Sequence, residues 1–437
     1  MAWKFTPSDD PNTAPHAAGG WSGSLRVVDQ ATIAHVNQGY LVHPSGVFDA
    51  DRVYVPQAVH WRGRALMTPP PFPEEAEPLA GRWLWGGVLM DHFGHFIMES
   101  LGRLWGLDHE KVDGILFIPE SGFSSGPSPE LKPWQRLFLR LLQTDLPVRI
   151  VTRPTRVETL VVPGQGFGIG PLIGGAAHFR HFVQTRFAKD IAPQGGDKLY
   201  ISRSRLDADL GGIVLESRLE AQLQDHGYEA FHPQEHGLEA QIARYKAAKQ
   251  VISIDGSALH LFALVAGPDQ RVAVIKRRPG SAPDGIVDHL AGFTGQSPVV
   301  LDAIQRHWMR SDRRFADNMS YGEVDFQLLG EKLAEHGFLA PDQALTGFSA
   351  PEVGDFIAGL EGQMPKKGLY FRPIGLDHPK PAKKERGQRK RDIVAEGQAK
   401  ATKGKKIKIR AKPDATKPVN PRRLAREARR AAENAGG

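Results

Sequence analysis

The segment DHFGHFIMESLGRLWG, at 91–106, carries side chains that can exchange a proton with a bound group. His95, Glu99 and Arg103 are spaced four residues apart, which places them on one face of a helix. The opposite face is an apolar stripe formed by Ile97, Leu101, Leu104 and Trp105. We therefore predict a helix over about 94–107 that packs by its apolar stripe and presents a His/Glu/Arg row.

Two glycines, Gly102 and Gly106, share the polar face of this helix. A glycine within a helix costs roughly 1 kcal/mol relative to alanine, so we expect another group to approach this face closely. Two other interpretations stay open. In the first, the His/Glu/Arg row is simply an exposed polar face of the helix. In the second, His92, His95 and Glu99 bind a metal ion in a hydrolase. The HExxH arrangement of metalloproteases is absent.

A second segment, ISRSRL at 201–206, places Arg203 and Arg205 where a predicted strand ends. Each guanidinium can chelate two oxygens, which suits a diphosphate. Glu216 follows as the nearby acidic residue. The alternative is a pair of ordinary surface arginines.

A third segment, IDGSALHLF at 254–262, leads from a strand through Asp255, Gly256 and Ser257 into a helix that contains His260. Glycine lets a ligand approach the backbone, and the N–H groups and dipole of a helix start favour an anion. The alternative is a plain strand–helix connection that needs a glycine and a cap.

The elements of the second half bring these two segments together. Strands predicted at 198–204, 228–231, 251–254 and 271–276 alternate with helices at 215–226, 238–249 and 258–265. Such alternation with apolar strands indicates a parallel sheet covered on both faces. Ligands bind outside the carboxyl ends of its strands, so 203–205 and 255–257 should meet at one edge.

The first half is less regular. Its β-branched runs between 25 and 55 predict a small antiparallel sheet, followed by strands at 114–119, 148–152 and 157–163 and a helix at 133–142. The glycine-rich GQGFGIG at 164–170 does not fit G-x-G-x-x-G, and we interpret it as a flexible loop. The predicted organisation is an irregular segment 1–24, α/β domains 25–192 and 193–300, a helical return segment 301–345 and a tail 380–437.

Composition excludes several classes of protein. The 437 residues are 41% hydrophobic and 24% charged, which is ordinary for globular domains, and they contain no cysteine, so disulfide scaffolds and cysteine nucleophiles are excluded. The longest apolar run, 259–266, is far short of a membrane span, and the N-terminus has no apolar block. We expect a cytoplasmic protein.

The net charge of +7 divides unevenly between the body and the tail. Residues 380–437 hold 20 Lys/Arg and 6 Asp/Glu, so the tail carries +14 and the rest of the chain −7. The tail is either a disordered, solvated segment or an arm for an anionic membrane or nucleic acid. Aromatic residues are absent after Phe371, so we do not expect nucleic acid.

In order and separation, the three segments resemble the motifs of the family 61 glycosyltransferases, a group often labelled capsular polysaccharide biosynthesis proteins. Members share GHF-x-x-(D/E)-S-L-x-R-L-W, an IYISR segment with a nearby acidic residue, and an HGAGL-type turn. Their counterparts here lie at 94–105, at 199–203 with Glu216, and at 255–259. The chain departs from the pattern at Gly102, which replaces a proline, at Leu215, which replaces an asparagine, and at Asp255, which replaces the histidine of the turn.

The resemblance implies two Rossmann-like domains facing across a cleft, the GT-B arrangement, with the acceptor side in 25–192 and the donor side in 193–300. It also implies inverting transfer from a nucleotide-sugar to a glycan or other hydroxyl acceptor, in surface polysaccharide synthesis.

We expect Glu99, assisted by His95 and supported by Arg103, to be the general base. The residues expected to bind the donor are Arg203, Arg205, Glu216, Asp255, Gly256, Ser257 and His260. No metal and no cofactor are expected, because we identify no D-x-D metal motif in the body of the chain and cationic side chains can replace a divalent ion. The tail could hold the enzyme at the inner face of a membrane that carries lipid-linked acceptors. The alternatives are a tail-driven binding protein and the metal-dependent hydrolase.

Overall fold

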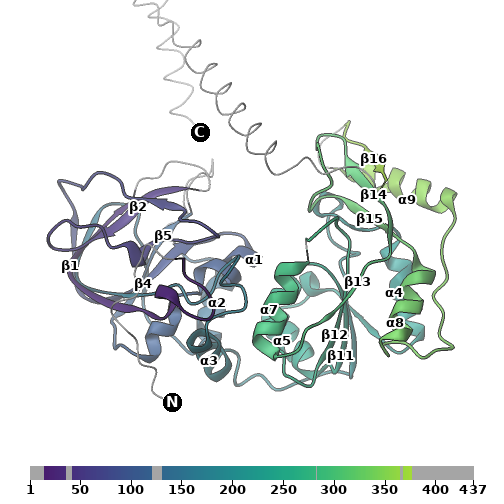
Figure 1. The fold of residues 1–437 in the computed structure, drawn as a ribbon, viewed down its shortest axis with the longest axis horizontal. Coiled ribbons are helices and arrows are strands. Elements are labelled where there is room, and N and C mark those ends of the chain that lie inside the picture. Colours follow the sequence, from purple (N-terminus) through teal and green to yellow (C-terminus); the bar gives the residue numbers. More distant parts are fainter. Residues whose placement is uncertain (1–13, 36–41, 121–129, 282, 365–367, 376–437) are drawn as a thin grey trace, which may run out of the picture. The chain divides into compact units, whose positions relative to one another are not determined.

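The computed structural model of the protein describes residues 14–35, 42–120, 130–281, 283–364 and 368–375. These residues belong to one compact unit that ends at His378. The predicted tail at 380–437 and residues 1–13 of the predicted irregular segment lie outside the described residues. Three β-sheets organise the part of the chain that is described (Figure 1).

A seven-stranded mixed sheet forms from the first half, in the order β3-β2-β1-β7-β4-β5-β6. Its strands are β1 (Leu25–His35), β2 (His43–Phe48), β3 (Met67–Thr68), β4 (Glu77–Leu89), β5 (Gly114–Pro119), β6 (Val148–Ile150) and β7 (Thr155–Pro163). β1 is antiparallel to β2, as predicted, and also to β7, whereas β4 is parallel to β5 and β7. Besides the short α1 (Phe93–His95), the described residues of this half form α2 (Pro133–Leu141), as predicted, and α3 (Ala177–Arg186), which the sequence pattern did not indicate.

The segment after β4 is not the regular helix that its spacing predicts. A short turn, α1 (Phe93–His95), continues as a π-helical turn over Phe96–Ser100 and ends in a 3₁₀ turn over Leu104–Asp108. The apolar stripe does enter the core, since Ile97, Leu101 and Leu104 are all buried. π-turns interrupt helices mostly as single turns and often at functional sites.

The two glycines of this segment accommodate the chain's own backbone. A Cβ atom on Gly102 would overlap the carbonyl oxygen of Phe167, and one on Gly106 would lie 2.5 Å from Cγ of Pro163. The close approach predicted for this face is therefore made by 163–167 and not by a ligand. The glycine-rich segment, expected to be a flexible loop, is buried from Gly164 to Gly168.

A five-stranded, wholly parallel sheet forms the second half, in the order β10-β8-β11-β12-β13. Its strands are β8 (Lys198–Ile201), β10 (Glu229–Phe231), β11 (Gln250–Ile254), β12 (Arg271–Ile275) and β13 (Val299–Leu301). The helices are α4 (Glu216–Asp225), α5 (Leu238–Ala247), α6 (Ala258–Val265) and α7 (Asp284–Thr294). This confirms the predicted alternation and makes the protein a mixed α/β structure, consistent with a Rossmann-like fold.

Alternate residues of these strands enter different cores, as the two-residue period of a strand requires. In β12, Val272 and Val274 pack with α5, α6 and α7, whereas Ala273 and Ile275 pack with α4 and α8 (Phe326–Glu335). Figure 1 shows α5 and α7 on one side of this sheet and α4 and α8 on the other. The first core continues into the apolar residues of the seven-stranded sheet.

Residues 301–345 differ from the helical segment that was predicted. They contribute β14 (Ile304–Arg310) and β15 (Tyr321–Val324) to a four-stranded sheet with β9 (Gly212–Ile213) and β16 (Phe371–Ile374), and only then α8. A further helix, α9 (Ala350–Gly362), follows. Arg306 pairs with Glu323 across β14 and β15, with 3.9 Å between the charged atoms. Such cross-strand partners are not visible in the local sequence pattern.

Candidate active site

Charged residues and a glycine follow the carboxyl ends of three neighbouring strands in the parallel sheet. Arg203 comes two residues after β8, and Arg277 and Arg278 come two and three residues after β12, while Asp255 and Gly256 directly follow β11, which lies between these strands. Because the strands are parallel and adjacent, these groups meet at one edge of the sheet. The sequence rule thus located Arg203 and the 255–257 turn, but it was not applied to β12.

A cavity of about 430 Å³ lies at this edge and joins both halves of the chain. The first half contributes His92, Gly94, His95, Met98, Ile169 and Ile173. The second half contributes Arg203, Leu206, Leu210, Gly256, Ser257, His260, Arg277, Arg278, Gly285, Ile286 and Asn318. The ionisable side chains on these walls are arginines and histidines, so the cavity suits an anionic ligand.

The two halves touch beside the cavity. A Cβ atom placed on Gly94 would lie 3.1 Å from Cβ of Ser257, which is tighter than ordinary contact. On Gly256 it would lie 3.0 Å from Nη1 of Arg203. Glycine at 94 therefore lets α1 reach the start of α6, and glycine at 256 leaves room for a guanidinium.

Arg203 is fixed from behind by the buried carboxylate of Glu216. Oε1 of Glu216 accepts hydrogen bonds from the backbone N–H of Arg203 at 2.6 Å and from the hydroxyl groups of Ser202 and Tyr200 at 2.9 and 3.1 Å. Burial raises the pKa of Glu216 to about 7, although these hydrogen bonds oppose the shift. Glu216 does not line the cavity, so it orients the Arg203 segment and does not meet a ligand there.

Arg203 itself keeps part of its guanidinium available. Its Nη2 donates to the carbonyl oxygens of Leu210 and Gly211, at 3.0 and 3.2 Å, while its buried Nε has no partner among the described residues. Burial lowers its pKa, and Glu216 and Asp255 oppose that shift.

Arg205 lies elsewhere. Its side chain is 59% exposed and pairs with Glu235 at 2.8 Å, and it is not part of the cavity wall. The structure therefore places Arg203, but not Arg205, at the cavity, although the sequence pattern predicted the same diphosphate-binding role for both.

Asp255 is fully buried between two guanidiniums. Its Oδ1 lies 3.0 Å from Nε of Arg277 and 3.0 Å from Nε of Arg278. Nε of Arg277 also donates to the backbone oxygen of Asp255, and Nη1 of Arg277 donates to the carbonyl oxygen of Asn318. Burial lowers the pKa of Arg277 to about 9.

His260 lines the cavity from α6 and is backed by His289 of α7. The two Nδ1 atoms lie 3.0 Å apart, so one of the rings must carry its hydrogen on Nδ1. Burial lowers the pKa of His260 to about 4, and it lowers that of the fully buried His289 well below the ordinary range. His260 is therefore a neutral hydrogen-bonding group at neutral pH.

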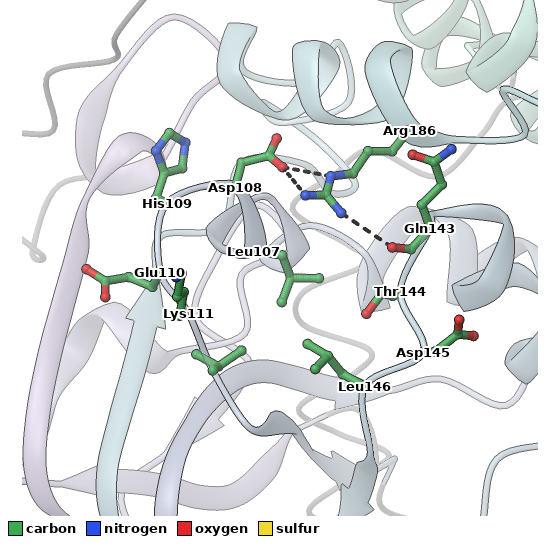
Figure 2. Close-up of a pocket in the computed structure, with 11 residues that line it drawn as sticks. Leu107, Asp108, His109, Glu110, Lys111, Gln143, Thr144, Asp145, Leu146 and Arg186 are labelled. Carbon is green, nitrogen blue, oxygen red and sulfur yellow. Dashed lines mark hydrogen bonds and ion pairs between the residues drawn. The ribbon is translucent and has the colours of Figure 1, made fainter.

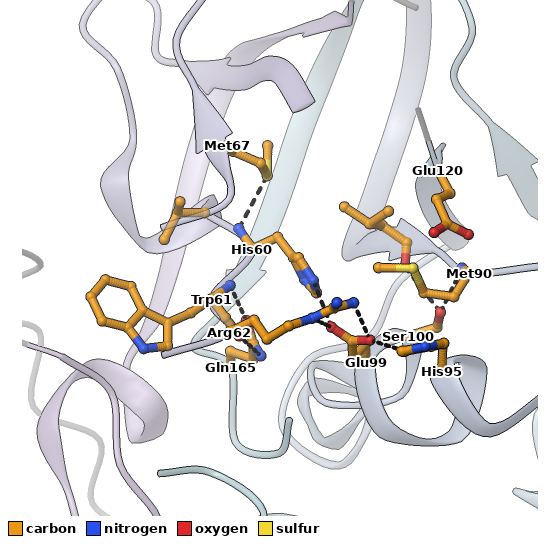
Figure 3. Close-up of polar contacts among 12 residues, drawn as sticks. His60, Trp61, Arg62, Met67, Met90, His95, Glu99, Ser100, Glu120 and Gln165 are labelled. Carbon is orange, nitrogen blue, oxygen red and sulfur yellow. Dashed lines mark hydrogen bonds and ion pairs between the residues drawn. The ribbon is translucent and has the colours of Figure 1, made fainter. Parts of the chain in front are cut away.

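On the other side of the cavity, Glu99 is enclosed by three basic side chains (Figure 3). Its Oε1 lies 3.1 Å from Nε2 of His60 and 2.6 Å from Nε of Arg62, and its Oε2 lies 2.5 Å from Nη2 of Arg62 and 2.6 Å from Nδ1 of His95. Burial alone would raise the pKa of Glu99, but the hydrogen bonds from His60, His95 and Arg62 outweigh it and hold the pKa well below the ordinary value.

The contact with Glu99 determines which ring nitrogen of His95 is left for another partner. Glu99 is ionised, so Nδ1 of His95 must donate the hydrogen in their bond, and Nε2 is the nitrogen that this bond leaves unused. The His95 side chain is 43% exposed and lines the cavity, whereas the Glu99 side chain is 0% exposed and does not. Glu99 is thus set back from the cavity wall, and its role as the base stays a prediction.

Arg103 does not face the cavity either. It is buried, and its terminal nitrogens donate to the backbone oxygens of Val59, at 2.6 Å, and Pro163. Gln165 exchanges two hydrogen bonds with the backbone of Trp61, at 2.9 and 3.0 Å (Figure 3). Both residues therefore hold the segment that carries His60 and Arg62. No local signal in the sequence linked that segment to Glu99, which lies 37 to 39 positions further on.

The geometry gives the metal-dependent alternative little support. Both oxygens of Glu99 are engaged by His60, Arg62 and His95. Within the described ranges, no three or more His, Asp or Glu side chains form a group that could hold a metal ion.

The sequence does contain two Asp-x-Asp triplets, at 49–51 and 207–209, a pattern that can bind a divalent ion beside a diphosphate. The second stands between Leu206 and Leu210 of the cavity wall, although neither aspartate lines the cavity. The expectation that no metal is needed assumed that the body of the chain has no Asp-x-Asp motif, and that assumption is wrong. The independence from metal itself stays a prediction.

A larger hollow of about 880 Å³ is lined by residues outside the three sequence motifs (Figure 2). Its wall comes from 107–112 and 143–146, with Arg186. Arg186 pairs with Asp108 at 2.6 Å across this wall. None of the predicted site residues contributes to it, so we place the candidate active site in the smaller cavity.

Comparison with known proteins supports the resemblance drawn from the motifs. The model of the family described as Glycosyltransferase 61 matches residues 93–272, a range that contains all the predicted site residues. No curated protein matches the chain. In the part of the chain that the structure describes, no helix is long and apolar enough to span a membrane.

Proposed function

Because the chain carries a Glycosyltransferase 61 domain over residues 93–272, we propose that it transfers a sugar from a nucleoside-diphosphate donor to a hydroxyl group of a glycan acceptor, with inversion at the anomeric carbon. One observation carries this proposal. A single cavity brings a histidine base from one half of the chain against an arginine edge from the other. This joint cavity also favours two Rossmann-like parts of the GT-B kind acting on a shared ligand.

His95 is the proposed general base. Its Nε2 takes the proton from the acceptor hydroxyl as that oxygen forms a bond to the anomeric carbon. Glu99 holds the ring by Nδ1 and stabilises the imidazolium that results, while Arg62 keeps Glu99 ionised. Glu99 thus acts through His95 and does not touch the acceptor.

The bond between the anomeric carbon and the diphosphate oxygen breaks at the same time, and its electron pair leaves with the diphosphate. Arg203 and Arg278, together with the first turn of α6, stabilise the negative charge that develops there. His260, a neutral ring in this cavity, contributes a hydrogen bond to the donor sugar or a phosphate oxygen.

The direct test is a panel of nucleotide-sugars in which release of the nucleoside diphosphate is followed. We expect one donor to be turned over by the unmodified protein. Arg203→Ala should weaken donor binding by about tenfold or more, because a charge-assisted contact is lost, whereas Arg205→Ala, the matched control outside the cavity, should change nothing. If Arg205→Ala weakens the donor as much as Arg203→Ala, the assigned site is wrong.

The need for a metal is tested in the same assay. We propose that arginines supply the positive charge, so a chelator should leave turnover within about twofold, a change smaller than 0.5 kcal/mol in barrier. Loss of activity with the chelator, restored by Mg²⁺ or Mn²⁺, would instead assign Asp207 and Asp209 a role in metal binding.

A further inference from the structure

Asp255 presents an electrostatic problem if a diphosphate binds in this cavity. A carboxylate at the end of β11 should repel an anion, and the motif that the chain resembles has a histidine there. Asp255 is nevertheless fully buried at that edge, with Arg203, Arg277 and Arg278 around it. Its role must therefore depend on what it does to these arginines.

The contacts of Asp255 with Arg277 and Arg278 all involve one end of each guanidinium. It meets both residues at Nε, so their terminal nitrogens remain for other partners. Nη1 of Arg277 is used by the Asn318 backbone, but the terminal nitrogens of Arg278 have no hydrogen-bond partner among the described residues. Arg278 lines the cavity with a side chain that is 21% exposed.

Two guanidiniums this close repel each other unless a negative charge lies between them. Oδ1 of Asp255 supplies that charge at equal distances of 3.0 Å, and a carboxylate in such a position also limits the rotamers of both arginines. Pre-ordered arginines lose less conformational entropy when a ligand binds. With Arg203, the three cations and one anion keep this edge net positive.

We propose that Asp255 is a positioning residue, which holds Arg277 and Arg278 by Nε so that Arg278, together with Arg203, presents its terminal nitrogens to the diphosphate of the donor. The inference rests on the proposed function. It assigns a role to Asp255, and the two arginines that Asp255 holds lie beyond residue 272, where the family match ends.

The affinity for inorganic pyrophosphate, measured by calorimetry, distinguishes a positioning role of Asp255 from simple repulsion, because the two roles predict opposite changes in affinity when Asp255 is replaced. Asp255→Ala raises the charge of the site by one unit, so if Asp255 only repels anions, this variant binds pyrophosphate more tightly. If Asp255 positions the arginines, binding weakens by about tenfold despite the added positive charge. Asp255→Asn, which keeps an acceptor oxygen, should fall between Asp255→Ala and the unmodified protein.

Arg278→Lys provides a test that does not depend on a buried substitution. Lysine keeps the charge but loses the fork anchored at Nε, so we expect pyrophosphate affinity to fall while affinity for inorganic phosphate changes little. Arg205→Lys is the matched control and should leave both affinities unchanged. Thermal unfolding of each variant identifies any that fail to fold, in which case Arg278→Lys decides the question.

The outcomes separate this inference from the proposed function. If the unmodified protein binds neither pyrophosphate nor any nucleoside diphosphate, the donor site itself is wrong. If it binds them but Asp255→Ala binds as tightly or more tightly, or if Arg278→Lys leaves the ratio of pyrophosphate to phosphate affinity intact, the positioning role of Asp255 is overturned and the transferase proposal stands.

Discussion

The roles of individual residues in this cavity depend on which of their atoms are already occupied. Glu99 and Asp255 both carry carboxylates, yet each is buried against basic side chains and neither can reach a ligand directly. The sequence patterns indicated that both residues belong to the site. Their burial and their contacts with basic side chains indicate that they hold those side chains in place. We propose that the groups that act on the substrates are the neighbours that these carboxylates hold, His95 and Arg278.

A double-mutant cycle tests whether Glu99 acts through His95. His95→Gln should lower turnover by about two to four orders of magnitude, the usual contribution of a general base. Glu99→Gln should also be costly, because a neutral amide no longer fixes the imidazole. In the His95→Gln background, however, Glu99→Gln should cost little more. A Glu99→Gln effect that is equally large without His95 would make Glu99 the base after all.

The stability of the protein should depend on the protonation of Glu216. Burial raises its pKa to about 7 from the ordinary 4.5, so the folded protein holds a proton that the unfolded chain releases. This stabilisation is complete below about pH 4.5 and is lost as the pH rises through 7. The melting temperature of the unmodified protein relative to Glu216→Gln should therefore fall between about pH 5 and about pH 8. A difference that stays constant over this range would contradict the assignment.

At the scale of elements, the regular part of the fold was accessible from the sequence. β5 and α6 have the predicted boundaries, and β8, β11 and β12 with their helices lie within a few residues of theirs. The hydrophobic period of these elements and the residues that end them are visible in the local sequence. The rule for parallel sheets then placed Arg203 beside the 255–257 turn.

Elements whose conformation depends on residues distant in the sequence could not be predicted from the local sequence pattern. Residues 163–167 pack against Gly102 and Gly106, which follow the π-helical turn over Phe96–Ser100, and β14 and β15 are strands that pair with each other. The hydrogen bonds of His60 and Arg62 with Glu99 also join residues that are far apart in the chain. Arg277 and Arg278 are a different case, since the rule that located Arg203 applies equally to the end of β12.

The packing of 163–167 against Gly102, just after the π-helical turn, predicts that a larger residue at 102 destabilises the protein. Gly102→Ala would place a methyl group against the carbonyl of Phe167, so we expect a loss of about 1 to 3 kcal/mol in unfolding free energy. Gly237→Ala, at a position where a Cβ would meet nothing within 4 Å, is the matched control and should change stability by less than about 0.5 kcal/mol. Chemical denaturation measures both, and equal effects would contradict this packing.

At the scale of the whole molecule, described residues from both halves of the chain line the cavity, and the basic tail is a separate feature of the sequence. We propose that residues 380–437, with a net charge of +14, hold a cytoplasmic enzyme against an anionic membrane where lipid-linked acceptors reside. Nucleic acid is a less suitable partner, because the tail lacks aromatic side chains.

Truncation after residue 379 separates sugar transfer by the body of the chain from membrane binding by the tail. The shortened protein should keep donor turnover, while its flotation with anionic liposomes at low salt should be lost; flotation of the full chain should weaken as salt rises. Loss of donor turnover on truncation would favour the alternative in which the tail carries the function.

The location of a bound nucleoside diphosphate, determined in a crystal structure of the complex, tests the central claim most directly. We expect its phosphates within hydrogen-bond distance of Arg203 and Arg278, and the position of the transferred sugar to open toward Nε2 of His95. A diphosphate bound in the hollow beside Arg186, or bound at the sheet edge with no path to His95, would show that the two halves of the chain do not form one reaction centre.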